Sequence, residues 1–271
     1  MKKLLPILLA VVMILSLCAC KSSEVKNVEA LIDALAETDT VDLDQLIEAQ
    51  EAYSALSEQD RAKVGNYDAL EDAFEAGYYD LANRMLEIGY TCDTVSSDNI
   101  SMWDNMGADY VQLGFLSTLF FCVEGNTWDD YVEMVETHNS EDLTMDDLEN
   151  DLLFSAWALY PEACNYVGDL PLSVKEGYED KILAACAEYW KNWNAVYDNW
   201  DNVFNDVTDF RNAFKDDHPA ELTTLNNWSV TLDQYVDLSL ELSGSLYSYS
   251  ESVSDFRDEI TQYVTEADSY Y

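Results

Sequence analysis

Residue types able to do acid–base, nucleophilic or metal chemistry are few in this sequence, and they are poorly spaced. The two histidines, His138 and His218, lie among polar residues at expected helix breaks, without a partner at metal-ligand spacing. No GxSxG or SxxK motif is present to activate a serine, and there is no glycine-rich phosphate loop. We therefore expect two exposed loop histidines, no catalytic residue, no metal ligand and no cofactor.

Carboxylates are the exception, because 54 acidic residues stand against 13 basic ones and give a formal net charge of −41. A glycosidase needs two carboxylates about 5–10 Å apart in a cleft, which a narrow helical bundle rarely offers. For calcium, residues 39–44 lack the glycine and spacing of a binding loop, and Asp198 to Asp209 falls on an expected helix. The acidity argues against nucleic acid as a partner and is typical of a solvated surface.

Aromatic side chains are the remaining candidates for a binding site, because they stack on sugars and dominate protein interfaces. Most of them fit the apolar seam of a helix and are expected in the core. A ligand held between helices would lie near Trp193 and Trp200, whereas three tyrosines fall off the seam and are expected on the surface. The candidate ligand contacts are thus Trp193, Trp200, Tyr247, Tyr270 and Tyr271.

The amino-terminal residues have the layout of a secretory signal peptide over 1–19. Lys2 and Lys3 precede an apolar run that ends in Leu17-Cys18-Ala19-Cys20. This ending resembles the lipobox of bacterial lipoproteins, which implies cleavage before Cys20 and a diacylglyceryl group on its sulfur. Two acyl chains hold a protein at a membrane far more firmly than one. The expected location is the extracytoplasmic face of the cell membrane; an uncleaved anchor helix and free secretion are the alternatives.

Four further cysteines are widely spaced, without a CxxC pair: Cys92, Cys122, Cys164 and Cys186. A place outside the cytoplasm permits disulfides, but the spacing selects no pairing. Cys122 and Cys186 lie in apolar helical runs, where cysteine usually behaves as a small buried side chain.

Only 4 prolines and 9 glycines occur in 271 residues, which favours an all-α fold. Residues 20–77 should form a tether and a small three-helix module, with helices over 25–37 and 44–56 and a third element capped by Ser57. Two segments of this module, Ile47-Glu48-Ala49 through Tyr53-Ser54-Ala55-Leu56 and Val64-Gly65-Asn66-Tyr67, resemble a small helical repeat of Gram-positive-type cell-surface proteins. The resemblance implies surface display and no catalysis.

Residues 78–271 should form a bundle of long helices. We expect a helix over 67–89, a polar break over 91–97, and a helix capped by Asp98 that runs to about 124. The almost wholly apolar stretch 113–123 is too short to span a bilayer and predicts a buried core helix. A further helix should end before Pro161, followed by a loop over 162–172 and a capping box at 173–176.

Two long heptad seams give the clearest structural signal. The first runs from Ile182 to Phe214, with a third position per heptad at Leu183, Trp190, Tyr197 and Phe204 that predicts a bundle helix rather than a two-stranded coiled coil. The second runs from Leu225 to Ala267, interrupted only by Ser239, with Gly244 as a possible bend. Each helix would be about 60–70 Å long if unbroken, and the short connector between them makes them antiparallel.

These observations predict an elongated antiparallel bundle preceded by a small surface module. The favoured function is a membrane-anchored, non-catalytic lipoprotein that binds a protein or a cell-envelope or host glycan. The alternative is a sensor or binding protein for a small molecule, and a hydrolase is the least favoured. A solid core would favour the first, an internal pocket near Trp193 the second, and an open acidic cleft the third.

Overall fold

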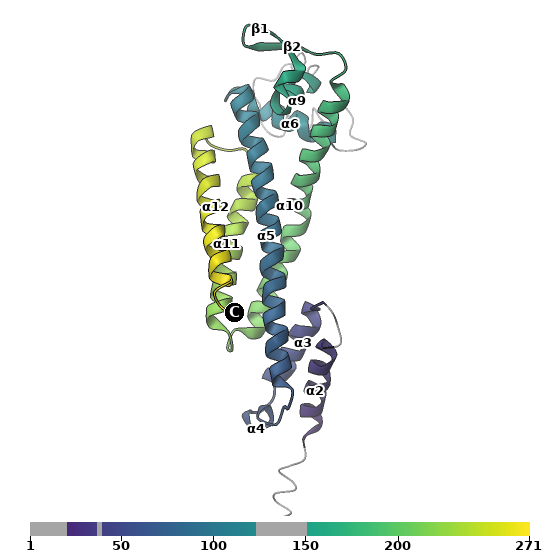
Figure 1. Cartoon of the computed structure of the whole chain (residues 1–271), viewed down its shortest axis with the longest axis vertical. Coiled ribbons are helices and arrows are strands. Elements are labelled where there is room, and N and C mark those ends of the chain that lie inside the picture. Colours follow the sequence, from purple (N-terminus) through teal and green to yellow (C-terminus); the bar gives the residue numbers. More distant parts are fainter. Residues whose placement is uncertain (1–20, 37–39, 123–150) are drawn as a thin grey trace, which may run out of the picture. The chain divides into compact units, whose positions relative to one another are not determined.

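The computed structural model describes residues 21–36, 40–122 and 151–271, which are mostly helical (Figure 1). The prediction of an all-α helical bundle is confirmed. The expected signal peptide, Cys20 and His138 lie outside the described residues. Within those residues, no helix is long and apolar enough to cross a membrane.

The chain divides into two compact units. The first contains the described residues up to Asn83 together with Asn205–Leu222, and the second contains Arg84–Phe204 and Thr223–Tyr271. Three helices contribute residues to both units: α5 (Tyr67–Met106), α10 (Glu179–Phe214) and α11 (Pro219–Leu240). The range 20–77 of the expected module falls in the first unit, which also includes the end of α10.

The first unit begins with α2 (Ser23–Leu35), α3 (Leu43–Ser54) and the single-turn α4 (Glu58–Arg61). Ser57 caps α4 as expected, because its hydroxyl accepts from the Asp60 N–H at 3.2 Å. The Asn66 amide donates to the Glu29 carbonyl at 2.9 Å and the Asp33 carboxylate at 2.8 Å. The residues before α5 are thereby tied to α2.

An aromatic cluster forms the core of this unit around Phe74 of α5. Its ring lies 5.2 Å from Phe210, 4.8 Å from Phe214 and 3.6 Å from His218, measured between centroids. The expectation of an exposed histidine at 218 is wrong, because this side chain is only 15% exposed and lies between Glu71 and Glu221. Stacking on Phe74 explains why a polar residue in a connector is mostly covered.

The predicted polar break over 91–97 is absent, since α5 is continuous from Tyr67 to Met106. Its hydroxyl groups bond to carbonyls one turn earlier, Thr91 to Glu87 at 2.9 Å and Thr94 to Tyr90 at 3.0 Å. Such back-bonding satisfies the side chains without opening the helix. The break comes instead at Gly107, whose φ of 73° suits glycine.

The apolar stretch after this break forms α6 (Val111–Cys122), which packs on α9 (Asp151–Leu159). Phe115 and Leu116 are buried, as expected of a helix that is apolar on all sides. Gly114 lets the helices approach, because a methyl group there would lie 3.0 Å from the Ala158 Cβ. The hydroxyls of Ser117 and Ser155 meet at 3.1 Å inside this contact.

A β-hairpin replaces the predicted loop and capping box. After a 3-10 turn (Pro161–Ala163), strand β1 (Cys164–Val167) pairs antiparallel with β2 (Leu170–Val174). The Ser173 hydroxyl accepts from the Asn165 amide at 2.9 Å, so it bridges the strands and caps no helix. The connector through Gly177, with φ 85°, leads to α10 at Glu179.

The first predicted seam is confirmed along α10. Nine of its ten positions are buried: Ile182, Cys186, Tyr189, Val196, Trp200, Val203, Val207, Phe210 and Phe214. The exception is Trp193, which is half-buried. The widening positions differ from expectation, because Leu183 is 42% and Tyr197 61% exposed.

The second seam is divided between two helices. α11 ends at Leu240, Gly244 takes a φ of 83°, and α12 (Leu246–Ala267) starts with Ser245 in a reciprocal cap with Ser248. The chain then folds back, since the Tyr249 hydroxyl bonds to the Leu238 carbonyl at 3.1 Å and Thr231 bonds to Glu259 at 3.1 Å. The prediction of one helix over this seam, at most bent at Gly244, is therefore wrong.

Candidate functional site

Three aromatic rings of α10 form a stack in the second unit. Trp190 and Trp193 lie 5.2 Å apart between centroids with planes 10° from parallel, and Trp193 and Tyr197 lie 5.4 Å apart at 12°. Spacings of three and four residues place all three on one face of the helix. The exposure of Tyr197 makes the stack accessible from solvent.

Two indole hydrogen bonds fix the register between α10 and α11. The Trp200 N–H donates to Oδ1 of Asp233 at 2.8 Å, and the Trp193 N–H donates to the Leu240 carbonyl at 3.4 Å. The two tryptophans are seven residues apart on α10, and their two partners are seven residues apart on α11. The earlier tryptophan bonds to the later partner. The helices are therefore antiparallel, with the stack beside the carboxyl end of α11.

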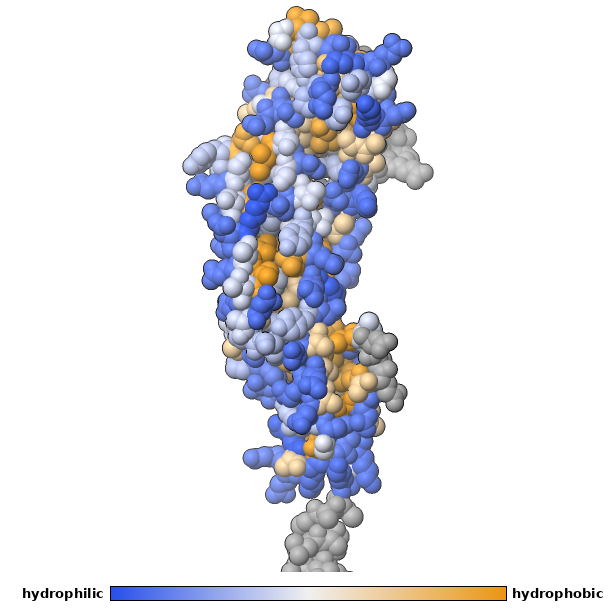
Figure 2. Space-filling model, viewed as in Figure 1, coloured by the Kyte–Doolittle hydropathy of each residue, from blue (hydrophilic) through white to orange (hydrophobic). Residues whose placement is uncertain are grey.

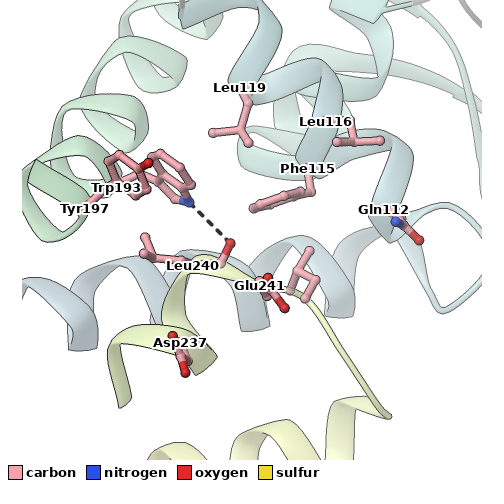
Figure 3. Close-up of a pocket in the computed structure, with 10 residues that line it drawn as sticks. Gln112, Phe115, Leu116, Leu119, Trp193, Tyr197, Asp237, Leu240 and Glu241 are labelled. Atoms are coloured by element: carbon pink, nitrogen blue, oxygen red, sulfur yellow. Dashed lines mark hydrogen bonds between the residues drawn. The ribbon is translucent and has the colours of Figure 1, made fainter. Parts of the chain in front are cut away.

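A groove of about 610 Å³ lies where α6, α10 and the end of α11 meet (Figure 3). Phe115 and Leu119 of α6 form one wall, opposite Trp193 and Tyr197 of α10 (Figure 3). The described residues that line it are Gln112, Phe115, Leu116, Leu119, Trp193, Tyr197, Asp237, Leu240, Glu241 and Leu242. The volume lies within the range of about 300–1,000 Å³ typical of small-molecule sites.

The two carboxylates of the groove, Asp237 and Glu241, come from the α11 side. Both are exposed, and they follow Asp233 at four-residue intervals. Partial burial, with the charges of Asp233 and Glu241, raises the pKa of Asp237. Three like charges along one helical face repel one another, and a positive charge near them would be favoured.

A buried polar junction around Asn99 supports the groove from inside the unit. Oδ1 of Asn99 accepts from the Tyr189 hydroxyl at 2.7 Å, and its amide donates to the Ser239 carbonyl and the Tyr249 hydroxyl, each at 2.9 Å. Ser239, the polar residue within the second seam, directs its own hydroxyl to the Val236 carbonyl at 2.9 Å. The junction links α10 and α11, two of the three helices that line the groove.

The candidate ligand contacts do not form one site. Trp193 lines the groove, whereas Trp200 is 4% exposed and faces Asp233. Tyr247 is 77% and Tyr271 48% exposed, and the Tyr270 hydroxyl lies 2.8 Å from that of Thr224. None of the three tyrosines lines the groove.

Sequence reasoning missed most of the groove lining. Phe115 and Leu119 were expected as core, and the two carboxylates were two among many. Tyr197 was expected to widen the apolar seam of its helix, so its position gave no signal of the 61% exposure that the structure shows.

In the described part of the chain, no three or more histidine, cysteine, aspartate or glutamate side chains lie together in a way that could hold a metal ion. Asp198 to Asp209 lies within α10, as predicted. No family model, curated protein or solved structure matches the chain.

Proposed function

We propose that this protein is a non-catalytic binding lipoprotein, anchored through Cys20 on the extracytoplasmic face of the membrane, that holds a small ligand in the groove between α6, α10 and α11. The observation that carries the proposal is the groove itself. It joins apolar walls to a stacked, accessible aromatic face and a few polar groups, which is the usual composition of a ligand site.

The arrangement of polar groups favours binding over hydrolysis. The described residues of the lining include no serine, cysteine or histidine, and their two carboxylates both come from the α11 side. Glycoside hydrolysis needs carboxyl groups on both sides of the scissile bond. A ligand between Phe115 and Trp193 would have these carboxylates along one edge only.

The binding site can be tested with two matched tyrosine variants. Tyr197→Leu removes a ring of the groove, and Tyr90→Leu removes a tyrosine that is 65% exposed on α5, away from the groove. Ligand-observed NMR of the mature protein against a panel of metabolites and soluble glycans should find compounds that bind the wild type and Tyr90→Leu but not Tyr197→Leu. Equal binding by all three proteins, or no binding by any, would reject the groove.

The anchor is tested separately. A Cys20→Ser change should release the protein from the membrane or leave it unprocessed, because the acidic body has no attraction to anionic head groups. A variant that stayed membrane-bound with its leader removed would contradict lipidation at Cys20.

A second candidate function, binding of a protein partner, is favoured by the β1–β2 hairpin. Its apolar side chains are exposed: Val167 by 72%, Leu170 by 60% and Leu172 by 54% (Figure 2). In the described chain these strands pair only with each other, and a strand edge of this kind is a common place for a partner to add a strand.

The hairpin candidate predicts a partner that binds the wild type and is lost with Val167→Ser and Leu170→Ser together. Cross-linking in intact cells, followed by mass spectrometry, would identify this partner. A set of cross-linked proteins unchanged by the double variant would argue against a role of the hairpin in recognition.

A further inference from the structure

The charge of the groove is one-sided. Among the described residues, its lining holds two carboxylates, Asp237 and Glu241, and no lysine, arginine or histidine. α11 also ends here, at Leu240, without a basic residue in its last turn. The carboxyl end of a helix carries a partial negative charge that favours a cation. Neither source of negative potential has a positive partner in the lining.

The apolar surface of the groove is itself suited to a cation. The face of an indole or phenol ring is the negative end of a quadrupole, which attracts ammonium groups within about 6 Å of the ring centre. Phe115 and Tyr197 bring two such rings to one space (Figure 3), and Trp193 lies beside them, stacked between Trp190 and Tyr197. Rings and carboxylates therefore favour the same ligand charge.

We infer that the groove selects a small organic cation, with an ammonium group on the α11 side, where Asp237 and Glu241 lie, and an apolar or aromatic body between Phe115 and the stacked Trp193 and Tyr197. The inference rests on the proposed function, because it names the ligand class for that groove. A net charge of −41 attracts every cation, inorganic ions included. The aromatic walls distinguish an organic cation from a hydrated metal ion, because only the former gains from burial of an apolar body.

Three probes that share a phenyl ring and differ in charge test this selection: phenethylammonium, phenylethanol and phenylpropanoate. Isothermal titration of the mature protein should rank their affinities cation, neutral, anion, with the cation about tenfold tighter than the alcohol, as expected for one close charge interaction. Added salt should weaken phenethylammonium binding and leave phenylethanol unchanged.

A pair of double variants locates the charge effect. Asp237→Asn with Glu241→Gln should reduce the preference for the cation to about twofold or less, without loss of phenylethanol binding. Glu251→Gln with Asp255→Asn removes two exposed carboxylates at the same four-residue spacing on α12, outside the groove, and should keep the preference. All four side chains are exposed, so both variants should fold.

The outcomes separate the inference from the proposed function. Phenylethanol binding equal to phenethylammonium, with both lost in Tyr197→Leu, would overturn charge selection and keep the groove as a binding site. Equal loss of the preference in both double variants would also overturn it, since net charge alone would then explain the attraction. Absence of phenethylammonium binding overturns the inference, and the metabolite screen with Tyr197→Leu then decides whether the groove binds anything.

Discussion

Tyr189 of α10 donates its phenolic proton to Oδ1 of Asn99 on α5 across 2.7 Å, and both side chains are buried. The same amide group bonds to the Ser239 carbonyl of α11 and the Tyr249 hydroxyl of α12. One side chain thus satisfies partners on three other helices. Buried polar groups are costly when unpaired, so such a junction favours one packing arrangement over others.

Asn99→Leu should lower the free energy of unfolding by about 3 kcal/mol, because the Tyr189 hydroxyl, the Ser239 carbonyl and the Tyr249 hydroxyl would each lose a hydrogen bond in the core. Urea denaturation of the mature protein measures this change. The matched control is Asn199→Ala, which removes an exposed amide bonded only within α10, to the Ala195 carbonyl. The control should change stability by less than about 0.5 kcal/mol. Equal stability of the two variants would mean that the junction contributes little.

Asp98, next to Asn99 on α5, should make stability depend on pH. Burial, with the nearby charge of Glu188, raises its pKa from the ordinary 3.8 to about 6. The folded state therefore binds the proton of Asp98 more tightly than the unfolded state does. The stability that comes from this tighter proton binding is present at low pH and is lost as pH rises from about 4 to 6.

Asp98→Asn removes the cost of keeping this partly buried carboxylate charged. The variant should therefore be more stable than the wild type at pH 7 by about 1–2 kcal/mol, and the difference should shrink towards zero near pH 4. The difference between variant and wild type in urea denaturation, taken at each pH, cancels the effect of the other carboxylates. Asp104→Asn, an exposed change on the same helix, is the control. A gain from Asp98→Asn that did not vary with pH would contradict the raised pKa.

Periodic burial could be read from the sequence, whereas the ends of helices depended on contacts between distant residues. The seam of α10 was predictable because each of its apolar positions contributes to the same period. The continuity of α5 through Thr91 and Thr94 was not, since the same hydroxyls can bond within a helix or end one. The reversal of the chain at Gly244 was predictable only as a bend, because no local feature of the sequence indicates that the Tyr249 hydroxyl bonds to the Leu238 carbonyl.

The candidate site was predictable to the extent of one wall. Trp193 stood out by residue type and position, but its partners Phe115, Asp237 and Glu241 come from other helices. Their meeting depends on the register set by Trp200 and Asp233. The sequence alone does not indicate which of its 54 acidic residues lie near Trp193 in the folded protein.

The buried thiols should react only after unfolding. Cys92 and Cys164 are free, and both are at most 1% exposed; burial raises the pKa of Cys92 to about 12. Because the thiolate is the reactive form, alkylation of Cys92 at pH 8 should be about a hundredfold slower in the native protein than in urea. Peptide mapping after iodoacetamide treatment measures each rate.

An introduced cysteine at an exposed site, Ser254→Cys on α12, serves as the reference for an accessible thiol. Native labelling of Cys92 at the rate of this reference would contradict its burial. A peptide pair joined by a disulfide between Cys92 and Cys164 would contradict their free state.

Two helical glycines should respond oppositely to alanine. At Gly89 the nearest atom to an added methyl group is the Ile260 Cδ1 at 3.4 Å, an ordinary contact, whereas at Gly114 the methyl group would lie 2.9 Å from the Met106 Cε and 3.0 Å from the Ala158 Cβ. Gly89→Ala should therefore raise the free energy of unfolding by about 0.5–1 kcal/mol through helix propensity. Gly114→Ala should lower it by about 1–3 kcal/mol, because α6 and α9 must separate or Met106 must leave its rotamer.

Thermal and urea denaturation of both variants tests the pair. Since propensity acts equally on the two sites, stabilisation by both changes would show that α6 and α9 can adjust, and the wall of the groove that carries Phe115 would then be adaptable rather than fixed.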